Sequence, residues 1–216
     1  MSRTKITTIS GAIGVGKSTV LDILRKRDFN VVPSVGKTEG TVQKILQMKY
    51  LDEFTTWRWD IINFQNMMVS DRLVNLAHVT RNKERKDTLL DRGFIDALAF
   101  ALIELGNEDY EKLLAMYKPS IQFELEQLGF NHIFILISSY SKDLIITRLN
   151  KRDKVLTTKQ KERSLNNIER FDDAYRTVMF HLGLVNDYIE INANNSPETI
   201  ADEIEKILAQ KDCSSD

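Results

Sequence analysis

Five short runs rich in apolar and β-branched residues recur along the chain, separated by longer segments with a different pattern. Within each run such residues are nearly continuous rather than alternating, which is typical of strands covered on both faces of a parallel sheet. The runs comprise residues 6–9, 29–32, 88–90, 133–137 and 188–191. The pattern therefore predicts five parallel strands.

The segments between these runs carry apolar residues at helical spacing. In the last segment, Ile200, Ile204 and Leu208 are four residues apart and fall on one face of a helix. Ser196 suits the N-cap of this helix, and Pro197 suits its first turn. Alternating strands and helices predict an α/β protein with a doubly wound, five-stranded parallel sheet flanked by helices. Ligands of such sheets bind at the carboxyl ends of the strands, so functional residues are expected just after each run.

The overall composition is that of an ordinary globular protein and narrows the functions only slightly. The 216 residues suit one α/β domain, expected over residues 1–210, with a flexible tail at 211–216. Lys and Arg together number 30, and Asp and Glu together number 31. No global basic excess therefore indicates nucleic-acid binding, although a local basic cleft could still attract anions.

The cysteine content and the apolar stretches indicate in which cellular compartment the protein is expected. Cys213 is the only cysteine, which excludes an internal disulfide and a Cys-rich metal site. The first residues lack the apolar core of a signal peptide, and no apolar stretch approaches the length of a membrane span. The sequence predicts a cytoplasmic protein with no membrane partner.

A glycine-rich motif directly follows the first predicted strand. Its residues, which match the pattern Gly-x-x-x-x-Gly-Lys-Ser and extend into the next segment, are Gly11, Ala12, Ile13, Gly14, Val15, Gly16, Lys17, Ser18 and Thr19. Such glycines let backbone N–H groups turn towards phosphate oxygens, and the helix that follows points its positive end at them. Lys17 is expected to reach the β- and γ-phosphates, and Ser18 to offer its hydroxyl to magnesium. The motif predicts a site for ATP and Mg²⁺.

A second candidate, Asp91-Arg92-Gly93, follows the third predicted strand and should reach the same edge of the sheet. The carboxylate of Asp91 could hold the magnesium ion, directly or through water, or accept the proton of an attacking hydroxyl group. Arg92 could then clamp an oxygen or a phosphate of the acceptor. The alternative is a surface salt bridge that caps the next helix.

Basic residues cluster at 148–154, after a helix that is expected to begin near Ser141. Arg148 and Arg152 are four residues apart, so on a helix their guanidinium groups would share one face and could bracket a transferring phosphoryl group. We expect a helical lid at about 148–160 that closes over the substrate and excludes water. The alternative is a solvated, charged turn.

These three features together resemble the thymidylate kinase and deoxynucleoside kinase group of P-loop kinases. The resemblance spans most of the chain and includes the Arg-x-x-x-Arg lid pattern of Arg148 and Arg152. It implies a P-loop NTPase-type sheet, ATP and Mg²⁺ as cofactors, a nucleotide or nucleoside substrate, and a homodimer. The segment 90–99 is also similar to a broader group of P-loop nucleotide kinase-like ATPases whose substrates are mostly unassigned.

One departure from the family pattern concerns the general base. Many deoxynucleoside kinases carry an acid in a Glu-x-Pro-type motif after the second strand, whereas this chain reads Val-Val-Pro-Ser-Val-Gly-Lys at 31–37. Asp91 could take this role, or Glu39 could approach from the next helix. A third alternative is that no strong base is needed, because the transition state of phosphoryl transfer is loose and positioning dominates.

The acceptor side is predicted on a long helical segment at 53–80. Arg58, Gln65 and Arg72 fall seven residues apart and therefore share one face, which gives a polar stripe with apolar borders. A nucleobase edge could pair with Gln65, and an anionic or sugar group with the arginines. The candidate substrate-binding residues are Arg58, Gln65, Arg72, Phe64, Trp57 and Lys37.

An aromatic residue of this segment, Trp57 or Phe64, is available to stack on a base. Phe64-Gln65 resembles the Phe-Gln pair with which deoxynucleoside kinases read the base. The alternative is that the aromatic residues and methionines fill the core and the polar stripe is hydrated surface.

Three functions are consistent with these residues. The first is a kinase that moves the γ-phosphate of ATP to a nucleoside or a nucleoside monophosphate, with a monophosphate favoured because the basic residues named above could bind its phosphate. The second is a kinase that phosphorylates a hydroxyl group of DNA, or of a modified base within DNA such as 5-hydroxymethyluracil, by accepting an extruded nucleotide. The third is a P-loop ATPase without kinase activity.

Overall fold

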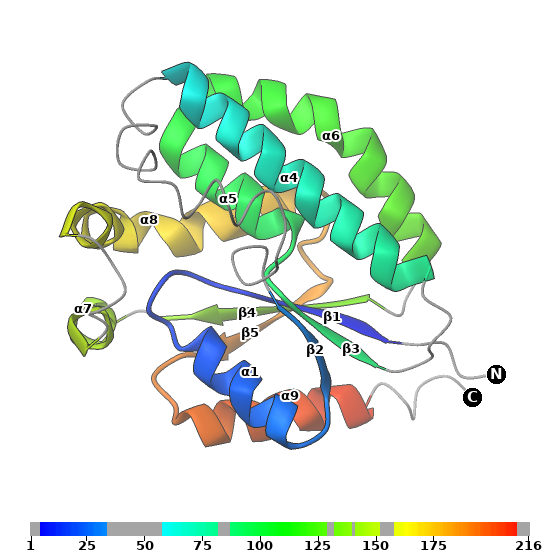
Figure 1. Ribbon diagram of the computed structural model, residues 1–216, viewed down its shortest axis with the longest axis vertical. Helices are drawn as coiled ribbons and strands as arrows, with labels where there is room; N and C mark the ends of the chain where they lie inside the picture. The colour runs from blue at the N-terminus through cyan, green and yellow to red at the C-terminus, as the bar shows by residue number, and fades with distance from the viewer. Residues whose placement is uncertain are drawn as a thin grey trace.

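The computed structural model describes residues 5–33, 58–81, 87–128, 132–139, 141–151 and 158–210. Within these ranges the chain forms one parallel sheet of five strands in the order β2-β3-β1-β4-β5 (Figure 1). The strands are β1 (Ile6–Ser10), β2 (Asn30–Val32), β3 (Thr88–Asp91), β4 (His132–Ser138) and β5 (Tyr188–Asn192). Each strand coincides with one of the five predicted runs, so the predicted parallel sheet is confirmed.

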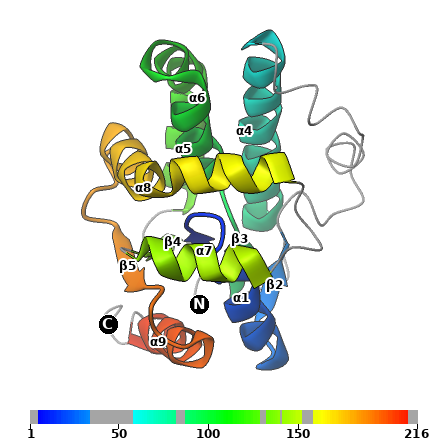
Figure 2. The same ribbon diagram turned by 90° about the vertical axis from the view of Figure 1, so that its left-hand side faces the viewer.

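Seven helices within the described ranges cover the two faces of this sheet. They are α1 (Lys17–Lys26), α4 (Arg58–Arg81), α5 (Phe94–Leu105), α6 (Asn107–Leu128), α7 (Lys142–Lys151), α8 (Thr158–His181) and α9 (Pro197–Gln210). Helices α1 and α9 lie side by side on one face, and α4, α5, α6 and α8 lie on the other (Figure 1). Figure 2 shows α7 crossing in front of the sheet, with α8 running next to it.

The centre of the sheet is its most completely buried part. All residues of β1, β3 and β4 are buried, whereas the edge strands β2 and β5 are partly exposed. Burial on both faces explains why apolar and β-branched residues dominate the central strands. The register pairs Ile9 with Asp91 and Ser10 with Leu136. The segments that follow β1, β3 and β4 therefore meet at the same edge of the sheet.

Two helix starts show how the sequence directs the chain at this edge. The side-chain Oγ of Ser196 accepts a hydrogen bond from the Thr199 N–H at 3.1 Å, which confirms the predicted N-cap of α9. At α5, the carboxylate of Asp96 accepts a hydrogen bond from the Gly93 N–H at 2.9 Å and so satisfies a donor that the helix itself leaves unpaired. Helix α5 packs against both α4 and α8, which places Asp96 deep in the molecule.

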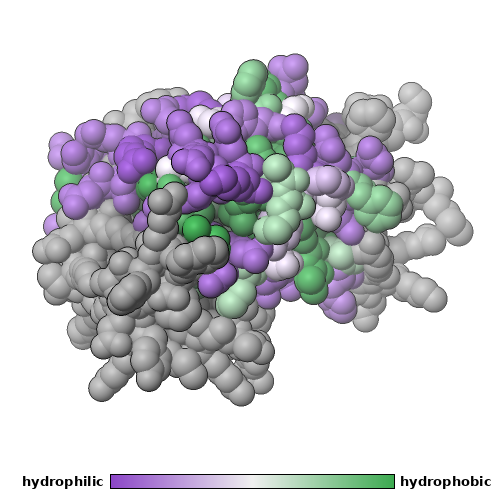
Figure 3. Space-filling model, turned by 90° about the horizontal axis from the view of Figure 1, so that it is seen from above, coloured by the Kyte–Doolittle hydropathy of each residue, from purple (hydrophilic) through white to green (hydrophobic). Residues whose placement is uncertain are grey.

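The described surface is mainly polar on the side where α4, α5 and α6 lie. Apolar residues form several separate areas there among hydrophilic ones (Figure 3). The exposed large apolar side chains within the described ranges are Val74, Met116, Phe123, Phe180 and Val185. No helix in these ranges combines the length and the apolar character that a bilayer crossing would require.

Candidate active site

The loop between β1 and α1 adopts a backbone that only glycine accommodates well at its key positions. Gly11 has a φ angle of +139°, and a Cβ atom at this position would lie 2.2 Å from the carbonyl oxygen of Ile137 in β4. Gly14 has a φ angle of +90°, and its Cβ atom would lie 2.9 Å from Cγ2 of Ile145 in α7. The glycines thus allow the loop to curl closely against β4 and α7.

A cavity of about 280 Å³ lies at this loop and gathers most of the predicted catalytic and cofactor-binding residues. The predicted residues that line it are Ile13, Gly14, Gly16, Lys17, Ser18, Thr19, Asp91, Arg92 and Arg148. Lys151, which falls within the predicted lid, and Pro197 complete its lining, and neither was among the predicted catalytic or cofactor-binding residues. Residues from two strand ends, from α7 and from the start of α9 therefore border one space of a size suited to a small ligand.

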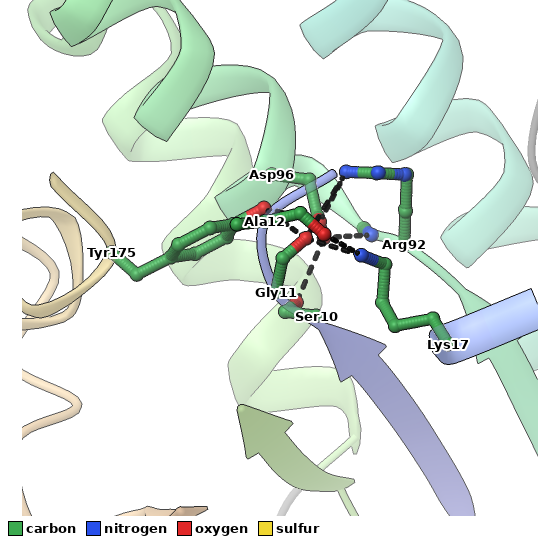
Figure 4. A network of polar contacts seen from close by, with 8 residues as sticks. Ser10, Gly11, Ala12, Lys17, Arg92, Asp96 and Tyr175 are labelled. Atoms are coloured by element: carbon green, nitrogen blue, oxygen red, sulfur yellow. Dashed lines mark hydrogen bonds and ion pairs between the residues drawn. The ribbon is translucent and has the colours of Figure 1, made fainter. Parts of the chain in front are cut away.

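Lys17 is buried at the floor of this site, with 5% of its surface exposed. Its Nζ donates hydrogen bonds to the carbonyl oxygen of Gly11 and, at 2.7 Å, to that of Ala12. The ammonium group is therefore held by the backbone of the same loop that precedes it (Figure 4). In this position it is close to the cavity and can exchange the two carbonyls for phosphate oxygens.

Asp91 ends β3 and is buried, with 4% of its surface exposed. Its register partner is Ile9, the next-to-last residue of β1. This burial contradicts the alternative of a surface salt bridge. Asp91 and Ser18 line the same cavity, so a residue with a carboxylate and a residue with a hydroxyl group border one space.

Arg92 has an unusual backbone that turns the chain between β3 and α5. Its φ angle is +71°, which costs a non-glycine residue of the order of 1 kcal/mol and is common at functional sites. Its N–H donates to the Ile9 carbonyl at 3.1 Å, and its Nη1 donates to Asp96 Oδ1 at 3.1 Å. The guanidinium carbon lies 5.4 Å from the centre of the Phe100 ring. These contacts hold Arg92 at the cavity wall.

Asp96 is a central residue of the site that we did not predict. It is 2% exposed, and four groups donate hydrogen bonds to its two carboxylate oxygens (Figure 4). The donors are Ser10 Oγ at 2.7 Å, the Gly93 N–H at 2.9 Å, Tyr175 Oη at 2.7 Å and Arg92 Nη1 at 3.1 Å. The usable signal in the sequence is that Asp96 is the only charged residue of the apolar segment 94–103. A carboxylate in such a helix needs buried donors.

Arg148 belongs to α7 and reaches back to the loop. Its Nη1 donates to the Val15 carbonyl at 2.7 Å, and its Nη2 donates to the Ala193 carbonyl at 3.0 Å. Burial lowers the pKa of Arg148 from its ordinary value. Helix α7 ends at Lys151, and the predicted partner Arg152 lies outside the described residues.

Gln65 and Arg72 lie two turns apart on α4, and both are buried, with 5% and 6% of their surfaces exposed. Their burial contradicts the alternative of hydrated surface for these two residues of the stripe. Burial lowers the pKa of Arg72, while the negative charge of Asp96 opposes the shift. Arg72 Nε has no hydrogen-bond partner among the described residues, whereas buried polar groups usually have one.

The remaining acceptor candidates are described less fully. Phe64 is half-buried on α4, next to Gln65. Arg58 is the first residue of α4, but its side chain is not among the described parts of the structure. Trp57 and Lys37 lie outside the described residues. Glu39, an alternative general base, also lies outside them.

The parallel sheet and the phosphate-binding loop, with Asp91 and Arg92 beside it, define the P-loop kinase class. The family model described as "Deoxynucleoside kinase" matches residues 7–212. The chain therefore belongs to the deoxynucleoside kinase family.

Individual relatives agree with this assignment. The chain is 25% identical over 203 residues to a thymidylate kinase of Campylobacter hominis, covering 92% of this chain and 96% of the relative. It is 27% identical over 205 residues to a thymidylate kinase of Campylobacter concisus, covering 92% of this chain and 95% of the relative.

A solved structure of the deoxyadenosine kinase from M. mycoides with bound dATP has the same fold. The TM-score is 0.64 at 17% identity, and the match covers 94% of this chain and 99% of that one.

Proposed function

We propose that the protein moves the γ-phosphate of ATP to a (deoxy)nucleoside or a (deoxy)nucleoside monophosphate. The observation that carries this function is that Lys17, Ser18 and Asp91 border one cavity at the carboxyl edge of the sheet. Membership of the deoxynucleoside kinase family supports it. The relatives and structural neighbours reported above are named for free nucleotides and nucleosides, which favours such acceptors over DNA and over simple ATP hydrolysis.

The loop between β1 and α1 is proposed to bind the phosphates of ATP. Backbone N–H groups of the loop and the N-terminus of α1 supply donors, and Lys17 supplies a positive charge. Arg92 and Arg148, which line the same cavity, would balance the charge that spreads over the transferring group. Arg152 of the proposed lid, about 148–160, would add a second arginine on the outer side.

The oxygen groups near the loop fit a magnesium ion. Mg²⁺ prefers oxygen ligands and is usually held by one or two protein groups together with substrate phosphates. The hydroxyl of Ser18 and the carboxylate of Asp91 are the two protein groups that would hold it. When bound, the ion neutralises negative charge on the β- and γ-phosphates.

Helix α4 is proposed to bind the acceptor. Gln65 can donate and accept hydrogen bonds at a base edge, and Arg72 can pair with an anionic or sugar oxygen. Both side chains are buried, and Arg72 Nε has no hydrogen-bond partner among the described residues, which is costly unless a ligand supplies one. A monophosphate acceptor suits the positive charge of Arg72, with Arg58, Lys37, Phe64 and Trp57 as further proposed contacts.

Two residues are candidates for the general base. Asp91 is near the proposed transfer site, and Glu39 stands in the segment that follows β2. A weak base would suffice if positioning dominates the transfer. The single domain at 1–210, the homodimer and the cytoplasmic location remain predictions.

A panel of acceptors tests the proposed function. The protein would be incubated with γ-labelled ATP, Mg²⁺ and, separately, nucleosides, deoxynucleoside monophosphates and DNA. We expect label on one class of free acceptor. Label that appears only as inorganic phosphate would contradict the kinase activity, and label on DNA alone would contradict the proposed acceptor.

Substitution of Lys17 tests whether this loop is the donor site. Lys17→Ala should reduce kcat/KM at least a hundredfold, because the lysine stabilises charge that develops during the transfer. Lys26→Ala removes an exposed lysine from the same helix and should leave the activity unchanged. Undiminished transfer by Lys17→Ala would show that the reaction takes place elsewhere.

A further inference from the structure

Three side-chain donors lie within hydrogen-bonding distance of the carbonyl oxygen of Gly11. Lys17 Nζ donates to it, Tyr175 Oη lies 3.0 Å from it, and Arg92 Nη1 lies 3.5 Å from it (Figure 4). A carbonyl oxygen has two lone pairs, so three donors compete for two positions. The Arg92 contact is the longest and therefore the weakest of the three.

Tyr175 has one hydroxyl proton and two acceptors within reach. Its Oη lies 2.7 Å from Asp96 Oδ1 and 3.0 Å from the Gly11 carbonyl oxygen, so the proton points to one of them at a time. The side chain is completely buried on α8, and burial raises its pKa well above the ordinary value. It is therefore a neutral donor at any pH at which the protein works.

The occupancy of the Gly11 carbonyl changes when a nucleotide binds, if the proposed function is correct. Lys17 would then leave this oxygen for the phosphates. A buried carbonyl that loses its donor is costly, and that cost would be subtracted from the affinity for the nucleotide. A second donor that is already in place reduces this cost.

We propose that Tyr175 is a positioning residue of the phosphate-binding loop, which supports the Gly11 carbonyl and so frees Lys17 for the donor phosphates. While Lys17 occupies the carbonyl, the shorter contact keeps the Tyr175 proton on Asp96. When Lys17 moves, the hydroxyl turns its proton to Gly11. The Asp96 oxygen that it leaves still accepts a hydrogen bond from Arg92.

Asp96 sets the position of this hydroxyl. Its other oxygen is held by Ser10 and by the Gly93 N–H, from the end of β1 and the start of α5. The carboxylate is therefore fixed to the sheet edge from which the loop departs. Tyr175 comes from α8, the helix that follows the proposed lid, so the contact joins that helix to the loop.

The test measures nucleotide affinity without turnover, by titration with fluorescent ribose-labelled ATP. Tyr175→Phe removes only the hydroxyl group and should weaken ATP binding roughly tenfold, the effect of leaving one buried carbonyl underpaired. AMP lacks the phosphates that Lys17 would reach, so its affinity, measured by competition, should stay within about twofold. An equal loss for ATP and AMP, or no loss for ATP, would overturn the role of Tyr175.

The effect of Tyr175→Phe on ATP affinity should depend on Lys17, which distinguishes the proposed positioning role from a purely structural role. In a Lys17→Ala background no ammonium has to leave the carbonyl, so adding Tyr175→Phe should change the ATP affinity less than twofold. A further tenfold loss in that background would show that Tyr175 acts independently of Lys17.

A second buried tyrosine provides the matched control. Tyr110 on α6 is 1% exposed, and its hydroxyl is hydrogen-bonded to His181 Nδ1 at 3.1 Å rather than to the loop. Tyr110→Phe should therefore keep the wild-type affinity for ATP. If the wild-type protein itself bound no labelled ATP, the proposed function would fail, whereas normal binding by both the wild type and Tyr175→Phe would contradict only the role of Tyr175.

Discussion

At the scale of single residues, the site depends on backbone positions that tolerate no side chain. Gly11 combines a positive φ angle with a close approach to the Ile137 carbonyl. Gly106, between α5 and α6, also has a positive φ angle of +77°, but a Cβ atom there would meet nothing within 4 Å. Both positions require a positive φ angle, but only Gly11 lacks space for a Cβ atom. Substitutions at the two positions therefore form a matched pair.

We expect Gly11→Ala to abolish ATP binding and to destabilise the fold by roughly 3 kcal/mol or more. The left-handed backbone costs about 1 kcal/mol, and the contact with Ile137 must also be relieved by moving the loop or β4. Gly106→Ala should cost only about 1 kcal/mol and keep the activity. Urea unfolding and nucleotide titration would measure both effects, and equal destabilisation of the two variants would contradict the steric role of Gly11.

A second residue-scale effect concerns Asp172 on α8. Burial raises its pKa from 3.8 to about 6, although the charge of Arg176 opposes the shift. The folded state therefore binds this proton more tightly than the unfolded state does. This group leaves stability unchanged below about pH 4, where both states are protonated. It destabilises the fold progressively between about pH 4 and 6, and the effect stays constant above that range, where both states are deprotonated.

Asp172→Asn should therefore stabilise the protein at pH 7 to 8 and lose this advantage near pH 4. We expect a gain of roughly 1 kcal/mol, less than the full pKa shift implies, because part of the carboxylate remains in contact with water. Melting temperatures from pH 4 to 8 would measure it. Asp173→Asn, at an 82% exposed neighbour, is the control. A gain that did not change with pH would contradict the titration of Asp172.

At the scale of elements, α4 places polar groups where a packed helix normally has apolar ones. Arg72 is buried within the electrostatic influence of Asp96 and Asp91, and its Nε has no partner among the described residues. Burial costs this charge desolvation energy, and the negative charges of Asp96, Asp71 and Asp91 offset only part of that cost, because the pKa of Arg72 is still lowered. If the proposed function is correct, the acceptor site on α4 therefore lowers the stability of the free protein.

Arg72→Met should accordingly stabilise the free protein by about 1 kcal/mol and raise the KM of the acceptor at least tenfold, without changing the affinity for ATP. Arg25→Met, which removes an exposed arginine paired with Asp22 on α1, should change neither quantity appreciably. Thermal unfolding and initial rates at varied acceptor concentration would measure the two effects. A loss of stability together with an unchanged KM would assign Arg72 to the fold alone.

The elements also show what could be predicted from the sequence. Lys17, Ser18 and Asp91 could be located because each follows a strand, and parallel strands end at one edge of a sheet. Asp96 and Tyr175 could not be brought together, because they lie 79 residues apart on two helices that meet only through packing. The bonds of Arg148 to Val15 and Ala193 depend in the same way on how α7 crosses the sheet.

At the scale of the whole molecule, the cavity joins parts of the chain that are distant in sequence. Its lining comes from the β1 loop, the end of β3, α7 and the start of α9, and β1 lies at the centre of the sheet. A ligand held by all of these segments binds the folded state and not the unfolded chain. Nucleotide binding should therefore stabilise the entire domain rather than a local segment.

ATP at a hundred times its Kd should stabilise the fold by about 2.7 kcal/mol. For a domain of this size that corresponds to a rise in melting temperature of roughly 5–10 °C. Arg27→Ala, which breaks the exposed pairs between α1 and α9 with Asp202 and Glu205, should show the same rise from a nearly unchanged starting temperature. Lys17→Ala should show a much smaller rise at the same ATP concentration, because the ammonium group is proposed to bind the phosphates directly. A rise of equal size in Lys17→Ala would mean that ATP stabilises the protein from a site other than this loop.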